Sequence, residues 1–76
     1  MGREPNLSNN AMSLYKRAMA LMEEGRFSDA IQHLQRVLAI HPNEPHVLYR
    51  LGSVLLQDGR PSEGVEVLQQ AADEDY

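Results

Sequence analysis

Three histidines are the residues of this chain whose chemistry most readily suggests a metal site. They are His33, His41 and His46. With Glu44 as a fourth ligand they could bind a metal ion, but no two of them have the i, i+4 spacing of a helical zinc motif. His41 and His46 also flank two prolines. We therefore interpret the histidines as solvated polar residues near helix ends, and we predict no metal site.

Acidic residues cluster at Glu23–Glu24 and at Asp73–Asp75. Adjacent carboxylates on a helix point in different directions, and neither cluster has the ligand spacing of a calcium-binding EF-hand loop. Gly25 and Gly59 are isolated, so they form no glycine-rich phosphate loop, and the chain has no cysteine nucleophile. The sequence therefore predicts a protein without enzymatic activity and without a cofactor.

The composition also restricts the classes of partner. The chain has 76 residues, enough for one small domain, and its net charge of -4 provides no basic surface for nucleic acid or an anionic membrane. No apolar run approaches the roughly 20 residues that insertion across a membrane requires. Met1 to Asn10 is polar and lacks the apolar stretch of a signal peptide, which favours the cytoplasm, although the sequence does not determine the compartment.

Apolar residues recur with the period of an α-helix in four segments, and no segment alternates as a half-buried strand would. Gly25 and Gly59 suit the left-handed position that ends a helix, and Pro42 prevents a helix from continuing past it. Pro45 and Pro61 are tolerated in a first helical turn. The pattern therefore predicts helices over residues 9–24, 28–41, 44–58 and 61–73.

Polar residues before these segments are candidate helix caps, because their side-chain oxygens accept hydrogen bonds from free backbone N–H groups. Ser8, Asn9 or Asn10 is expected to cap the first helix. Ser28 is expected to cap the second helix, and Asn43 the third.

The two halves of the chain are in register at an offset of 34 residues. Residues 11–42 align with residues 45–76, and eight of these 32 pairs are identical, where composition alone would give about two. Ala30 aligns with Gly64, and Ala18 with Gly52, so small residues recur where two helices of a hairpin approach closely. Alanine at position 30 predicts that alanine is tolerated at position 64. The identical pairs are Leu14/Leu48, Tyr15/Tyr49, Leu21/Leu55, Gly25/Gly59, Arg26/Arg60, Ser28/Ser62, Leu34/Leu68 and Gln35/Gln69.

Over about residues 11–76 this pattern resembles the tetratricopeptide repeat family. The resemblance implies an all-α fold, an α-solenoid of two stacked antiparallel helical hairpins that form a fragment of a right-handed superhelix. It implies a flexible leader at 1–8, a first repeat at 9–42 and a second, incompletely capped repeat at 43–76. It also implies a protein–protein interaction module. The resemblance rests on Leu14, Ala18, Leu21, Gly25, Phe27, Ala30, Leu34, Leu38 and Pro42, and on Leu48, Leu51, Gly52, Leu55, Gly59, Gly64, Leu68 and Ala71.

In stacked hairpins the first helices line a concave groove, and the second helices form the convex back. Tyr15 and Tyr49 are repeat-equivalent, as are Lys16 and Arg50, so an aromatic–cation pair is expected twice along the groove. Tyr15, Met19 and Tyr49 could instead pack between adjacent helices. Because methionine surfaces adapt to apolar side chains, we expect a peptide or partner helix with apolar anchors and some negative charge. The expected groove residues are Met12, Tyr15, Lys16, Met19, Met22, His46, Tyr49, Arg50, Ser53 and Leu56.

The last predicted helix has no covering element in this sequence. The acidic residues Asp73–Asp75 oppose the helix dipole, so we expect the end of the helix to fray rather than to cap the stack. Two repeats are also fewer than the three or so that usually sustain such a stack. The alternative function is therefore a structural unit that forms homo-oligomers through its uncovered face. That face is expected to comprise Val65, Leu68, Ala71 and Ala72.

Overall fold

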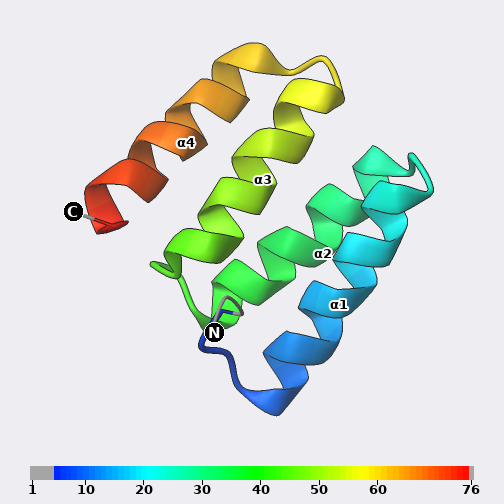
Figure 1. Cartoon of the computed structure of the whole chain (residues 1–76), viewed down its shortest axis with the longest axis vertical. Helices are drawn as coiled ribbons and strands as arrows, with labels where there is room; N and C mark the ends of the chain where they lie inside the picture. Colours follow the sequence, from blue (N-terminus) through cyan, green and yellow to red (C-terminus); the bar gives the residue numbers. More distant parts are fainter. Residues whose placement is uncertain (1–4, 76) are drawn as a thin grey trace.

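The structure is a computed structural model that describes residues 5–75, and it contains four α-helices (Figure 1). Every helix begins and ends within two residues of its predicted position. No strand occurs between residues 5 and 75, so the all-α fold class is confirmed. The helices are α1 (Asn9–Glu23), α2 (Phe27–Ile40), α3 (Pro45–Gln57) and α4 (Pro61–Asp75).

The helices form two antiparallel hairpins, α1 with α2 and α3 with α4, and these stack through the contact between α2 and α3 (Figure 1). One hydrophobic cluster runs through this contact. Leu34 and Val37 of α2 are fully buried in it, as are Val47 and Val54 of α3. Burial of each such side chain contributes about 1.5–3 kcal/mol, so the α2–α3 contact holds the two hairpins together.

The two hairpin turns have the same geometry. Gly25 and Gly59 both have a φ of 78°, the left-handed conformation that glycine adopts without steric cost. After each glycine, the N–H of the next residue donates to a carbonyl five residues earlier: Arg26 to Leu21 and Arg60 to Leu55, both at 2.9 Å. These bonds satisfy carbonyls that the helix end leaves free. The predicted helix ends at Gly25 and Gly59 are therefore confirmed.

Ser8 is the cap of α1. Of the three predicted candidates, Ser8, Asn9 and Asn10, it is the one that precedes the helix. Its Oγ accepts a hydrogen bond from the N–H of Ala11 at 3.3 Å. Its own N–H donates to Nε2 of His41 at 3.1 Å, and Pro5 and Leu7 are buried or half-buried beside it. The predicted flexible leader covers residues 1–8. Residues 1–4 of it lie outside the described residues, and the described part packs against the hairpins.

Two predicted caps are wrong. Ser28 lies inside α2, which begins at Phe27 after Arg26 and has no side-chain cap bond; the Arg26 guanidinium instead pairs with Asp29 at 2.7 Å. Asn43 is not the cap of α3, because Glu44, one residue closer to the helix, accepts from the N–H of His46 at 2.9 Å. Only at α3 does a longer charged side chain, that of Glu44, replace the predicted short polar cap; α2 begins without a side-chain cap.

The end of α4 also differs from the prediction. The helix continues to Asp75, two residues beyond the predicted end at residue 73, in spite of the acidic residues there. Tyr76 lies outside the described residues. No helix that the structure describes is both long enough and apolar enough to cross a membrane.

The small residues within each hairpin allow the two helices to approach closely. Ala18 and Ala30 are fully buried between α1 and α2. In the second hairpin the approach is closer still. A Cβ atom at Gly64 would lie 3.0 Å from the backbone oxygen of Gly52, and one at Gly52 would lie 2.6 Å from Cγ of Leu68. The second hairpin therefore requires glycine where the first accommodates alanine.

The close approach at residue 64 argues against the predicted tolerance of alanine there, and we expect Gly64→Ala to destabilise the protein. Alanine is the better helix former by about 1 kcal/mol, but overpacking against a backbone atom typically costs about 1–3 kcal/mol. The gain and the cost therefore leave a net loss of about 1 kcal/mol, which lowers Tm by about 4–8 °C in a domain of this size. Thermal unfolding followed by circular dichroism measures this decrease in Tm. Gln70→Ala, an exposed change on the same helix, is the control, and an equal or higher Tm for Gly64→Ala would contradict the close approach.

Candidate partner-binding groove

Two adjoining hollows lie along α1 and α3, and Arg50 of α3 lines both of them. We call them the aromatic hollow and the methionine hollow. Both are lined only by residues of α1 and α3, which are the first helices of the two hairpins. The two hollows therefore lie on the helices for which the sequence predicted a groove. The aromatic hollow is lined by Tyr15, His46, Tyr49, Arg50 and Ser53, and the methionine hollow by Met19, Met22, Glu23, Arg50 and Gln57.

Arg50 is held in place from the other hairpin. Its Nε donates a hydrogen bond to the hydroxyl of Tyr15 at 3.3 Å. Tyr15 is 9% exposed and belongs to the hydrophobic cluster, so its hydroxyl is a fixed point at the bottom of the groove. Within the described residues Arg50 takes part in no salt bridge. The guanidinium is thus oriented by Tyr15, and among the described residues no carboxylate forms a salt bridge with it.

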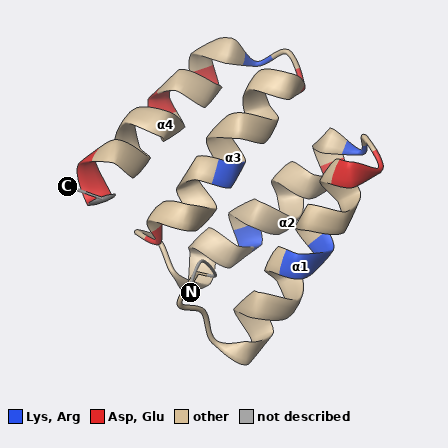
Figure 2. Cartoon of the chain, viewed as in Figure 1, with Lys and Arg blue, Asp and Glu red and all other residues tan. Residues whose placement is uncertain are grey.

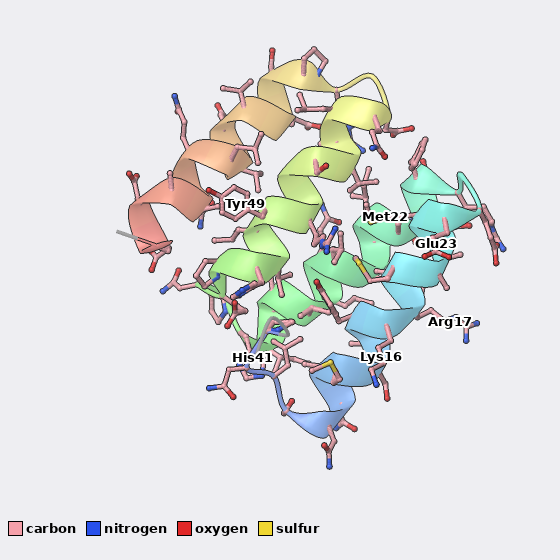
Figure 3. The ribbon with its side chains drawn as sticks, viewed as in Figure 1. Lys16, Arg17, Met22, Glu23, His41 and Tyr49 are labelled. Carbon is pink, nitrogen blue, oxygen red and sulfur yellow. The ribbon has the colours of Figure 1, made fainter. Side chains whose placement is uncertain are left out.

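The two aromatic–cation pairs are equivalent in the sequence but not in the structure. Tyr15 is buried, whereas Tyr49 is 47% exposed. Figure 3 shows Tyr49 on the side of α3 that is turned toward α4. The difference arises because α3 covers Tyr15, whereas no helix of the described chain covers Tyr49 in the corresponding way. The cation that Tyr15 contacts is Arg50 of the other repeat rather than its own neighbour, Lys16.

Seven of the ten predicted groove residues line the two hollows, and three do not. Met12 is half-buried against the hydrophobic cluster, and Lys16 is exposed but lines neither hollow. The assignment of Leu56 is wrong, because this side chain lies against α4: its Cδ2 would be 2.9 Å from a Cβ atom at Gly64. The seven are Tyr15, Met19, Met22, His46, Tyr49, Arg50 and Ser53.

Two lining residues, Glu23 and Gln57, were missed by the sequence analysis. They were detectable, because they occupy equivalent positions 34 residues apart. They also follow Lys16 and Arg50 by seven residues, which is close to two full turns of a helix. Glu23 places a negative charge at the methionine end of the groove (Figure 3).

Glu44 orients His46 at the aromatic end of the groove. One carboxylate oxygen, Oε1, accepts both the His46 backbone N–H at 2.9 Å and the ring Nδ1–H at 3.0 Å. Partial burial raises the pKa of Glu44, but the hydrogen bonds from His46 and from the Asn6 backbone outweigh it. Together they hold the pKa below its usual value of 4.5.

The three histidines have separate environments. His33 donates its Nδ1–H to the carbonyl of Asp29 at 2.9 Å, and His41 accepts from Ser8. His46 is bonded to Glu44. Among the residues that the structure describes, no group of three or more histidine, aspartate or glutamate side chains is arranged to hold a metal ion.

The predicted self-association face is only partly exposed. Val65 is 48% exposed and Ala72 is exposed. The assignment of Ala71 is wrong, because this residue is fully buried in the α3–α4 hairpin. Leu68 is half-buried, since it fills the space left by the missing side chain of Gly52. The exposed apolar part of α4 therefore centres on Val65 and Ala72.

A family model described as tetratricopeptide repeat matches residues 21–76 of the chain. That range spans the end of α1 and all of α2, α3 and α4. The chain belongs to the tetratricopeptide repeat family. Members of this family are interaction modules that bind proteins or peptides and that do not themselves catalyse reactions. No curated protein matches the tetratricopeptide repeats of this chain.

Because the pKa of Glu44 is lowered, the contribution of this helix cap to the free energy of unfolding depends on pH. The folded-state pKa lies below the unfolded-state value, so the stabilisation is present above pH 4.5 and is lost as the pH falls through the folded-state pKa. Glu44→Ala removes the cap, and we expect it to cost about 0.5–2 kcal/mol at neutral pH.

Denaturant unfolding of the wild-type and Glu44→Ala proteins between neutral pH and about pH 3 measures the difference in their free energies of unfolding. The difference in the free energy of unfolding should narrow as the pH falls, because the wild-type Glu44 carboxylate becomes protonated and no longer accepts the cap hydrogen bond. A difference that stays constant over this range would contradict the assigned role of the Glu44 carboxylate.

Proposed function

We propose that this chain is a non-enzymatic protein–protein interaction module whose groove binds a peptide or a partner helix. Its two repeats, residues 9–42 and 43–76, supply one wall each. The observation that carries the proposal is the position of Arg50 between the two hollows, oriented by Tyr15 and without a carboxylate partner among the described residues. A preoriented guanidinium binds a carboxylate more strongly than a mobile one does, because less conformational freedom is lost on binding.

The lining of the two hollows defines the chemistry of the partner. Met19 and Met22 offer a polarizable apolar surface that adapts to aliphatic or aromatic side chains. Tyr49 offers an exposed ring with a polar tip, which is typical of binding surfaces. The best-fitting partner therefore carries an apolar anchor for the methionine hollow and an aspartate or glutamate for Arg50.

The orientation of the partner follows from the charges along the groove. Glu23 lies at the methionine end, and Arg50 lies at the junction with the aromatic hollow. A negative side chain bound at the methionine end would be repelled by Glu23, whereas the same side chain near Arg50 would be attracted. We therefore expect the acidic residue of the partner to lie on the aromatic side of its apolar anchor.

Panning of a random peptide library against the chain tests this function. Enriched peptides should combine aliphatic or aromatic residues with aspartate or glutamate, and calorimetric titration then gives their Kd values. Tyr15→Phe should weaken binding by about 2- to 10-fold, because it removes the hydroxyl that orients Arg50 but keeps the buried ring. Arg50→Glu should weaken binding more strongly, and its effect should shrink as the salt concentration rises.

Arg36→Glu is the matched control, because it makes the same charge reversal at an exposed position of α2 outside both hollows. Its effect on Kd should be small. If Arg36→Glu weakens the selected peptides as much as Arg50→Glu does, binding depends on the overall charge and the groove assignment is wrong. If the library yields only peptides without acidic residues, the role given to Arg50 is wrong.

A further inference from the structure

The outer face of α4 corresponds to a face of α2 that is buried. Val65 of α4 is 48% exposed, whereas its repeat-equivalent in α2, Ile31, is 3% exposed. Leu68 is half-buried, whereas its equivalent, Leu34, is fully buried. The two faces therefore have similar apolar residues but differ in what covers them.

The covering element of α2 is α3, and it shows what kind of surface fits this face. α3 contributes Val47, Leu51 and Val54, which are spaced i, i+4, i+7 and are 0%, 6% and 0% exposed. All three belong to the hydrophobic cluster shared with α2. A helix with an apolar stripe at this spacing is thus the complement of the α2 face. Because the α4 face is repeat-equivalent to the α2 face, such a helix also complements α4.

The charge of α4 distinguishes it from α2. Its sequence contains the acidic residues Glu63, Glu66, Asp73, Glu74 and Asp75 but no lysine or arginine (Figure 2). Val65 and Ala72 are each followed by one of these acids, Glu66 and Asp73, so the apolar stripe has an acidic edge. Among the described acidic side chains of α4, only Glu63 forms an ion pair, with Arg60, which precedes the helix, at 2.5 Å. The edge therefore favours a partner with positive charge beside its apolar stripe.

A second copy of the chain fits this face poorly. Two α4 helices placed face to face would bring their acidic edges together. The α1 helix of a second copy would present Ser13, Arg17 and Ala20, the exposed equivalents of Val47, Leu51 and Val54. Docking in the manner of α3 would bury Arg17 where Leu51 lies, and Figure 3 shows Arg17 projecting freely outward from α1. Burial of an arginine without a paired carboxylate is unfavourable.

From this apolar stripe and its acidic edge we infer that the outer face of α4 is a second docking surface, separate from the groove. Its partner is an amphipathic helix of another protein. That helix presents aliphatic residues at i, i+4 and i+7 to Val65, Leu68 and Ala72, and lysine or arginine residues to Glu66 and Asp73. It lies on α4 as α3 lies on α2.

Three synthetic helical peptides test this inference against the full 76-residue chain. The first has a Val–Leu–Val stripe at i, i+4 and i+7 flanked by lysines, the second has the same stripe flanked by glutamates, and the third is a scrambled form of the first. Fluorescence titration measures Kd. The lysine-flanked peptide should bind at least about tenfold more tightly than either of the others.

Variants of the chain separate the α4 face from other sites. Val65→Ser should weaken the lysine-flanked peptide at least about fivefold, and Glu66→Lys with Asp73→Lys should shift the preference to the glutamate-flanked peptide. Glu24→Lys with Glu74→Lys reverses two exposed acids outside this edge and should leave the preference unchanged. Arg50→Ala, in the groove, should change Kd less than about twofold. All six substituted positions in these four variants are exposed, and circular dichroism verifies that helicity is retained.

Each contrary outcome overturns the inference. Equal binding of the scrambled or the glutamate-flanked peptide would show that no defined stripe and edge are recognised. An unchanged Kd for Val65→Ser would place the peptide elsewhere. Sedimentation of the wild-type chain that reveals a dimer, and a Val65→Ser variant that is monomeric at the same concentration, would assign the face to a second copy instead.

Discussion

The close approach of the two helices within each hairpin is the constraint on which the rest of the structure depends. It is set by residues without bulky side chains, Ala18 and Ala30 in one hairpin and Gly52 and Gly64 in the other. A larger side chain at any of these contacts would separate the helices and reduce the dispersion contacts along their whole length. With the helices held close, the larger apolar residues on their flanks are free to meet the neighbouring hairpin.

The groove is a consequence of that stacking. α2 and α3 are joined by a hydrophobic cluster, and this contact brings α1 and α3 near enough for Arg50 to reach the hydroxyl of Tyr15. Tyr15 has two functions at once, since its ring is part of the core and its hydroxyl orients a charged residue at the surface. Stability and the presentation of the groove are therefore coupled through one side chain, and a change that removes the ring affects both.

Repeat symmetry in the sequence does not produce repeat symmetry in the environments. Tyr15 and Tyr49 are identical residues with very different exposure, and Ile31 and Val65 are similar residues with different neighbours. In each pair the member in the first repeat is covered by a helix of the second repeat, and the member in the second repeat is not. Equivalent positions thus provide packing in one repeat and accessible surface in the other.

The four helices, their turns and the 34-residue repeat were determined by the sequence alone, because helical periodicity, glycine at left-handed positions and proline at helix boundaries are local properties. The proposed groove residues were predicted from helical phase, and seven of the ten line the two hollows. The identity of the caps at Arg26 and Glu44, the position of Leu56 against α4 and the burial of Ala71 depended on tertiary structure. They are decided by how closely two helices approach and by which helix lies beside them, and these are distances between residues far apart in the chain.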